Sequence, residues 1–178
     1  MSINVIFSVC FIKNRIRKTY LKLFILIKNM LAHNIHITVF CKPEEDTGLI
    51  IKKLLFFVPF DIKEQKIEIK KRTAIGFNEK KITVLEIYLE KESHTNLFLN
   101  NLTKNLTDEQ KSLVKKQADS RLDNELNFFL RFDKSKLINK DKLWLTDKGN
   151  CYHIRIKIAA FPKKKEIALK IINKIFSS

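Results

Sequence analysis

The sequence predicts an α+β fold with a single mixed, mainly antiparallel sheet and helices packed on one face. The segments with strand and helix periodicity follow the order β-α-β-β-α-α-β-β-β-β-α, in which helices gather between groups of strands. Hydrophobic residues make up 45% of the 178 residues, which suffices for the core of one domain. The chain shows no internal repeat and no Pro/Gly/Ser-rich linker, so we expect no second folded domain.

The first elements are predicted from their hydrophobic periodicity. Residues 33–41 alternate between apolar and polar, which is typical of a strand. Residues 43–46 (Pro-Glu-Glu-Asp) predict a helix start, because proline suits the first turn and acids face the positive end of the helix dipole. Apolar positions within 50–58 continue this helix to Pro59. Alternation over 65–72 and 81–90 predicts the next two strands.

The connection between the second and third predicted strands lies at 76–78 (Gly-Phe-Asn). Two short helices are predicted after the third strand. Ser93 is the expected cap of the first of these helices. Thr107 and Gln110 form a predicted capping box for the second, because the hydroxyl and the amide satisfy free backbone N–H groups reciprocally.

The last third of the chain predicts two hairpins and a helix. The first hairpin joins residues 121–123 to 127–134, and the second joins 143–146 to 152–161. Pro162 is expected to open the final helix.

Residues 1–29 differ from the rest, with six basic residues and no acidic one. Their two apolar runs are shorter than the ~20 residues that a membrane-spanning helix needs. Three interpretations are open for this basic, apolar extension: a membrane-surface anchor, a helix docked on the domain, or a segment that is not native. We favour the last, because ordinary globular patterning begins at Met30, and a membrane role is therefore not expected. The predicted domain is 30–178.

Composition excludes several function classes. The sequence has only three glycines, far apart, so Gly-rich phosphate and dinucleotide loops are absent. Three widely spaced cysteines form no disulfide framework and are typical of a reducing, cytoplasmic protein. No zinc spacing and no nucleophile motif is present. We therefore expect no enzymatic activity, no metal, no cofactor and no small-molecule substrate.

The net charge of +16 points to an anionic partner, and its distribution sharpens this inference. Windows at 70–81, 131–142 and 155–174 carry net charges of +4, +3 and +6. Of the 35 basic residues, 29 are Lys, so a compositional bias of the coding DNA is an alternative source of charge. Such a bias would spread evenly, whereas clustering is what an RNA-binding surface needs.

The candidate RNA-binding residues lie in these windows. Strand parity places basic and aromatic side chains together on the sheet face away from the core, where aromatic rings can stack bases. Three lysines are expected in the first turn of the final helix, where free N–H groups favour a phosphate. The predicted RNA-binding residues are Arg72, Phe129, Arg131, Lys134, Arg155, Lys157, Lys163, Lys164 and Lys165.

Arg121, Asp123 and Asp133 recur in two similar Arg-x-Asp contexts, Arg121-Leu122-Asp123 and Arg131-Phe132-Asp133. A Mg²⁺-binding carboxylate pair of a nuclease is one interpretation. We favour the other, in which these residues form cross-strand ion pairs that fix a hairpin.

Residues 130–134 (Leu-Arg-Phe-Asp-Lys), together with the segments 93–102, 106–114, 121–123 and 152–165, resemble an archaeal family of predicted RNA-binding proteins or predicted exosome subunits. That family is similar in fold to the ribosomal protein that docks 5S rRNA. The resemblance implies non-catalytic RNA binding in association with exosome or ribosome-related proteins, and it carries over to Arg131, Asp133 and Lys134. The loops after the first strand and between the second and third strands depart from the family pattern. The alternative is a protein–protein adaptor of such a complex without RNA affinity of its own.

Overall fold

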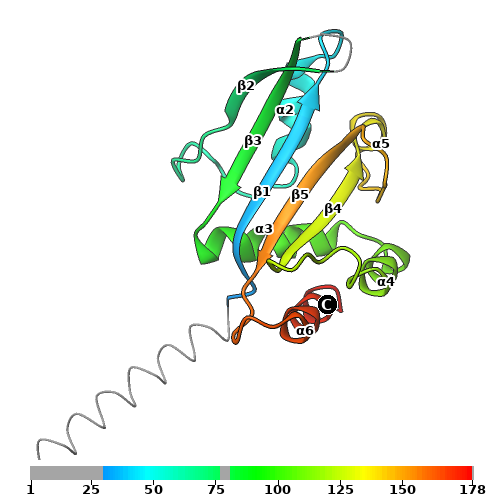
Figure 1. The fold of residues 1–178 in the computed structure, drawn as a ribbon. Helices are drawn as coiled ribbons and strands as arrows, with labels where there is room; N and C mark the ends of the chain where they lie inside the picture. Colours follow the sequence, from blue (N-terminus) through cyan, green and yellow to red (C-terminus); the bar gives the residue numbers. More distant parts are fainter. Residues whose placement is uncertain (1–29, 77–80, 178) are drawn as a thin grey trace, which may run out of the picture. The chain divides into compact units, whose positions relative to one another are not determined.

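A five-stranded antiparallel sheet with strand order β2-β3-β1-β5-β4 organises the computed structural model, which describes residues 30–76 and 81–177 (Figure 1). The elements are β1 (Ala32–Cys41), α2 (Thr47–Leu55), β2 (Lys70–Ile75), β3 (Lys81–Leu89), α3 (Glu92–Lys104), α4 (Asp108–Lys116), β4 (Asn127–Asp133), α5 (Lys134–Lys140), β5 (Cys151–Ile158) and α6 (Lys165–Ile175). The predicted α+β class with one sheet is confirmed, and every strand pairing is antiparallel. The interpretations of residues 1–29, and most of the connection at 76–78, lie outside the described residues.

The central strand β1 explains why one face of the sheet is buried. Ile37 of β1 pairs with Ile87 of β3 on one side and with Ile154 of β5 on the other, and all three are fully buried. Because side chains alternate across a strand, the neighbouring residues point to the opposite face. Helices cover only the buried face: α2 and α3 pack against β1, and α6 packs against β5 (Figure 1). The uncovered side is called the open face below.

Three of the four predicted helix starts are wrong by a few residues. Asp46 caps α2, because its Oδ1 accepts hydrogen bonds from the N–H groups of Gly48 (2.8 Å) and Leu49 (3.1 Å). The helix therefore begins after Asp46 rather than at Pro43. Ser93 lies inside α3, whose cap is Lys91. The capping box of Thr107 and Gln110 at α4 is confirmed, with hydrogen bonds of 3.2 and 3.3 Å.

The second strand begins later than predicted, because residues 61–67 form a turn. Asp61 accepts hydrogen bonds from Lys63 and Glu64, and the N–H of Ile67 donates to the carbonyl of Ile62 (2.8 Å). These bonds replace the sheet ladder, so β2 pairs with β3 only from Lys70 onward. The alternation at 65–72 reflects partial burial of two isoleucines rather than strand pairing throughout.

Of the two predicted hairpins, the first is present in a short form and the second is wrong. The segment 121–123 turns back onto the start of β4, with a bridge from Leu122 to Phe128 and a hydrogen bond from the N–H of Phe129 to the carbonyl of Arg121 (2.9 Å). The segment 143–146 bridges β4 instead of β5, through Leu145 and Phe132. Between them lies α5, which periodicity did not predict. It begins because the Asp133 carboxylate accepts a hydrogen bond from the N–H of Lys136 (2.8 Å). A short polar helix has too few apolar positions to give a periodic signal.

The final helix also starts later than expected. Pro162 follows a cis peptide bond, and α6 begins at Lys165 with Lys164 as its cap. Of the three neighbouring lysines, only Lys165 is therefore in the first turn. Within residues 30–76 and 81–177, each helix is too short or too polar to span a bilayer.

Candidate nucleic-acid interface

A row of rings and one guanidinium crosses the open face in register. Phe129 of β4 pairs with Arg155 of β5, which pairs with His36 of β1, which pairs with Tyr88 of β3. The His36 ring stacks on Tyr88, with 4.0 Å between centroids and 14° between planes. Lys70 of β2 places its ammonium 5.0 Å from the centre of the Tyr88 ring. The row therefore combines three flat rings with one guanidinium, and the Lys70 ammonium lies next to its Tyr88 end.

A second row runs beside the first. Arg131 of β4 pairs with His153 of β5, which pairs with Thr38 of β1 and then with Glu86 of β3. The rows also touch, because the Phe129 ring stacks on His153 at 5.7 Å between centroids. Strand parity therefore predicted the composition of this face correctly, although the two histidines and Tyr88 were not among the predicted binding residues.

The β4–β5 half of the open face carries two cations without acidic partners. Neither Arg131 nor Arg155 makes an ion pair with any described residue, and Arg131 is exposed. The Nε atom of Arg155 is buried and has no hydrogen-bond partner within the described part of the chain. Buried polar atoms are normally paired, so this N–H is a donor left unsatisfied within the described chain.

On the β1–β3 half, an arginine from the neighbouring β2 is already neutralised by a buried acid. Glu86 is buried between Arg72, whose Nε lies 2.9 Å from its carboxylate, and His36, whose Nε2 lies 3.1 Å away. Burial acts to raise the pKa of Glu86, but the hydrogen bond and charge of Arg72 and the neighbouring His36 outweigh it and lower that pKa. Arg72, a predicted RNA-binding residue, therefore lies on the face but is held by an acid.

Both open-face histidines have lowered pKa values. For His36, burial and the charge of Arg155 lower the pKa, and Glu86 offsets part of this effect. For His153, burial and the charges of Arg131, His36 and Arg155 all lower the pKa. Both histidine rings are therefore mostly neutral at pH 7. In this form a ring can stack on other rings, and one of its nitrogens can accept a hydrogen bond.

Lys134 is not the exposed phosphate contact that the sequence suggested. Only 2% of its side chain is exposed, and its Nζ donates to the carbonyl of Phe40 (2.8 Å) and to the carboxylate of Glu45 (2.7 Å). Glu45 also accepts a hydrogen bond from the N–H of Lys42 (2.7 Å). Lys134 thus joins the start of α5 to the loop after β1, and its role in this structure is to hold the fold.

The lysines around the start of α6 are largely paired with acids. Lys157 and Lys163 share Glu125, at 3.9 and 2.8 Å, and Lys165 lies 2.9 Å from Asp119. Lys164, the cap of α6, is exposed and forms no ion pair with the residues that the structure describes. The predicted three-lysine phosphate site in the first helical turn is therefore not assembled.

Arg121, Asp123 and Asp133 do not form the predicted cross-strand ion pairs. Arg121 donates to Gln117 (2.7 Å) and pairs with Asp147 (3.4 Å). Asp123 accepts hydrogen bonds within its own turn, from the N–H groups of Glu125 and Asn127, while Asp133 caps α5. In the described residues, no group of three or more His, Cys, Asp or Glu side chains is arranged to hold a metal ion.

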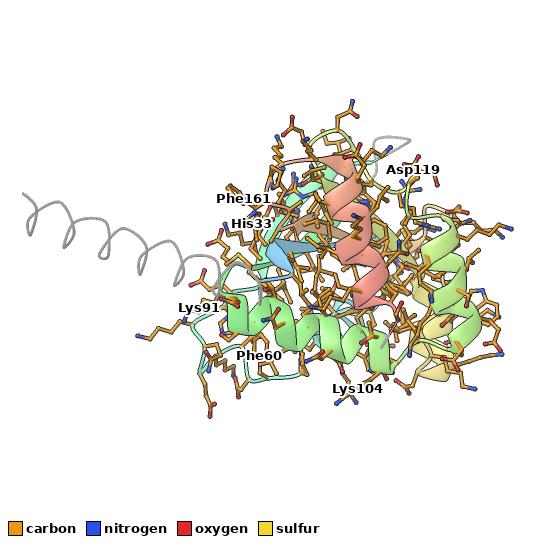
Figure 2. The ribbon with its side chains drawn as sticks, turned by 90° about the horizontal axis from the view of Figure 1, so that it is seen from below. His33, Phe60, Lys91, Lys104, Asp119 and Phe161 are labelled. Carbon is orange, nitrogen blue, oxygen red and sulfur yellow. The ribbon has the colours of Figure 1, made fainter. Side chains whose placement is uncertain are left out.

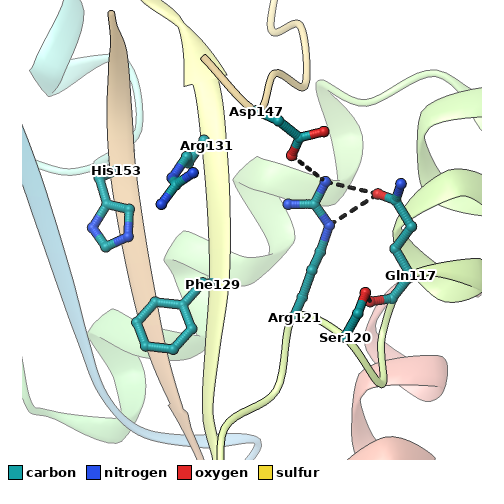
Figure 3. A pocket seen from close by; sticks show the side chains of 7 residues that line it. All are labelled: Gln117, Ser120, Arg121, Phe129, Arg131, Asp147 and His153. Carbon is teal, nitrogen blue, oxygen red and sulfur yellow. Dashed lines mark hydrogen bonds and ion pairs between the residues drawn. The ribbon is translucent and has the colours of Figure 1, made fainter. Parts of the chain in front are cut away.

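A hollow at the β4 edge of the open face is the feature that sequence reasoning missed (Figure 3). Its volume is about 480 Å³. Its lining comes from β4, β5, the segment after α4 and the loop before β5: Gln117, Ser120, Arg121, Phe129, Arg131, Asp147 and His153. No local motif unites these segments, so only the tertiary structure could reveal the site.

The fold and this face define an open-faced α+β protein with a basic and aromatic sheet surface. A family model described as RNA binding matches residues 34–159, more than half of the chain, and the chain belongs to that family. The predicted resemblance to archaeal RNA-binding proteins is thereby confirmed. The sequence is 28% identical over 141 residues to RNA-binding protein PAB1135 of Pyrococcus abyssi, covering 79% of this chain and 91% of that protein.

Solved structures share the fold. Protein AF2318 from Archaeoglobus fulgidus is 22% identical, with a TM-score of 0.72 over 81% of this chain and 99% of that one. Mth689 from Methanothermobacter thermautotrophicus is 26% identical, with a TM-score of 0.68 over 82% of this chain and 98% of that one. Both are described as DUF54 proteins.

Proposed function

We propose that the open face binds single-stranded RNA without catalysis, in the cytoplasm, as part of an RNA-processing complex such as the exosome or of a ribosome-related complex. The observation that carries the proposal is the pair of arginines on the β4–β5 half, Arg131 and Arg155, which lie among stacked rings and have no acidic partner among the described residues. Membership of the RNA-binding family supports the same ligand.

The chemistry of the face suits unpaired RNA. Phe129, His153, His36 and Tyr88 present ring faces on which bases can stack, and this kind of contact tolerates any base. Arginine guanidinium groups grip phosphates bidentately between such rings. We therefore expect the face to prefer single strands and loops over duplexes, whose bases are not available for stacking.

A salt titration of RNA binding tests the proposal. For a single strand, the slope of log affinity against log salt is about −0.7 for each phosphate neutralised. The double variant Arg131→Ala/Arg155→Ala should bind single-stranded RNA more weakly, with a slope shallower by about 1.4. The matched control is Lys104→Ala/Lys116→Ala, which removes the same charge from two exposed helical positions. Figure 2 shows Lys104 at the end of α3. Equal slopes in both variants would contradict an RNA site on the open face.

A protein–protein adaptor is the second candidate, because two large aromatic side chains are exposed. Trp144 and Phe161 are 57% and 74% exposed, and a partner protein could cover them. Capture of exosome or ribosome-associated proteins that survives nuclease treatment, combined with no RNA affinity of the isolated chain, would favour the adaptor. Loss of the captured proteins after nuclease treatment would favour RNA binding.

A further inference from the structure

The hollow at the β4 edge combines the groups that one nucleotide needs. Phe129 and His153 form a stacked pair on the sheet side, and Arg131 adds a guanidinium that makes no ion pair within residues 30–76 and 81–177. A volume of about 480 Å³ falls within the range of roughly 300–1,000 Å³ that small-ligand pockets occupy. These groups offer a ring for a base and a cation for a phosphate.

Arg121 supplies a second guanidinium, held in a fixed position. Its Nε and Nη2 atoms donate to Gln117 at 3.0 and 2.7 Å, and Nη2 also contacts Asp147 at 3.4 Å. The remaining nitrogen, Nη1, has no partner within the described residues, and Figure 3 shows it pointing toward β4. Gln117 and Asp147 thus orient Arg121 while leaving one edge of its guanidinium free for an anion.

The hollow lies at the β4 edge of the sheet, where the open face ends. The outer edge of β4 is occupied by two neighbouring segments. Phe129 donates its N–H to the carbonyl of Arg121 (2.9 Å), and Thr146 donates to the carbonyl of Arg131 (3.0 Å). The side chains of Gln117, Arg121 and Asp147 border the hollow on this side (Figure 3). These side chains therefore block the path of an RNA strand that runs across the sheet toward β4.

We propose that this hollow holds the terminal nucleotide of a single-stranded RNA, with its base stacked on Phe129 and its terminal phosphate held by Arg131 and Arg121. The inference rests on the proposed function, since the rest of the strand lies on the open face. A terminal phosphate monoester carries up to two negative charges and has three free oxygens. It therefore satisfies two guanidinium groups better than an internal diester, which carries one negative charge.

The experiment compares three forms of one RNA sequence in filter binding: linear with a terminal phosphate, linear with terminal hydroxyls, and circular. The phosphate is placed at the 5′ end in one arm and at the 3′ end in another, which identifies the end that is bound. We expect one phosphorylated form to bind about tenfold tighter than the circular form, the gain of roughly one good charge-assisted contact.

Two variants locate the effect. Ser120→Trp fills the hollow without changing its charge and should abolish the difference between phosphorylated linear and circular RNA, because Ser120 is an exposed lining residue. The matched control Ser112→Trp places the same side chain at an exposed position of α4 outside the lining and should keep the difference. Phe129→Leu should reduce the difference while retaining an apolar side chain.

The outcomes separate the two proposals. Equal binding of circular and phosphorylated linear RNA overturns the terminal-nucleotide site while leaving RNA binding by the open face intact. A preference for the phosphorylated end that Ser120→Trp does not reduce overturns the assignment to this hollow. The absence of binding by every form of RNA overturns the proposed function, and the inference with it.

Discussion

The two halves of the open face carry similar basic side chains but differ in what surrounds them. On the β1–β3 half, with the neighbouring β2, Glu86 lies buried between Arg72 and His36 and balances the charge of Arg72. On the β4–β5 half, Arg131 and Arg155 stand beside Phe129 and His153 with no acid paired to them in the described chain. An anionic ligand gains from unbalanced charge only, so position on the face alone does not make a cation a binding residue.

The same contrast exists within a few residues of sequence. Arg131 is exposed on the open face, whereas Lys134 is buried and bonded to Glu45. A single basic window of the sequence therefore contains both an exposed cation without an acidic partner in the described chain and a buried, structural one.

The largest expected effect is on the stability of the protein when the buried Lys134 is replaced. Lys134→Ala leaves Glu45 and the Phe40 carbonyl without their partner, and breaking such a bond pair should lower the free energy of unfolding by about 2–3 kcal/mol. Urea denaturation measures this. The matched control Lys136→Ala removes an exposed lysine of the same helix, whose contact with the Trp144 ring should contribute less than about 1 kcal/mol. A Lys134→Ala protein that keeps its stability but loses RNA affinity would reverse our assignment.

The next largest effect is on RNA affinity, when one arginine from each half of the open face is replaced. Arg131→Ala should weaken single-stranded RNA binding about five- to tenfold at low salt, the loss of one charge-assisted phosphate contact. Arg72→Ala removes the same side chain type from the other half and should cost less than about threefold, because Glu86 already balances that charge. Equilibrium binding at a single salt concentration suffices, and equal losses would show that the halves do not differ.

The contrast between the halves also clarifies how much the sequence could predict. Strand alternation correctly placed Leu130, Phe132 and Ile154 in the core, and therefore Arg131 and Arg155 on the opposite face. Periodicity along a strand is a local property, so it can be read from neighbouring residues.

What the sequence could not predict depends on distant partners. Lys134 and Glu45 are 89 positions apart, and Arg121 and Asp147 are 26 apart. The residues next to each partner in the sequence give no sign of such a pair. The net charge of a sequence window therefore says little about which of its cations lack an acidic partner after folding. The hollow escaped prediction for the same reason, since two strands and two connecting segments meet there only after folding.

The third prediction concerns a variant that removes the balancing acid from the β1–β3 half of the open face. Glu86→Gln keeps the shape of the side chain but removes its charge, which frees Arg72 to act on a phosphate. RNA affinity at low salt should rise about threefold, and the salt slope should become steeper by roughly 0.7. The control Glu109→Gln removes one negative charge from the exposed start of α4. A gain of the same size in both variants would indicate long-range attraction rather than a local effect of the open face.

The smallest effect concerns the two histidines, one in each half. Their pKa values lie below the usual 6.5 because burial and neighbouring arginines disfavour the charged ring. A phosphate bound beside Arg131 and Arg155 favours the charged ring of His153, so RNA should raise the pKa of His153 more than that of His36, which already has Glu86 beside it. The complex then binds more protons than the free protein, and RNA affinity should increase as the pH falls from about 7 to 5.5.

Folding stability should change in the opposite direction over the same pH range. The unfolded chain has histidine pKa values near 6.5, above those of His36 and His153 in the folded protein, so it binds more protons once the pH falls below 6.5. The free energy of unfolding should therefore be highest above pH 6.5 and decrease below it. NMR titration of the histidine rings with and without RNA measures both pKa values directly, and His153→Gln should flatten the pH dependence of RNA binding. If RNA moves the pKa of His36 as much as that of His153, the ligand lies over both halves of the face and their difference in charge does not direct it.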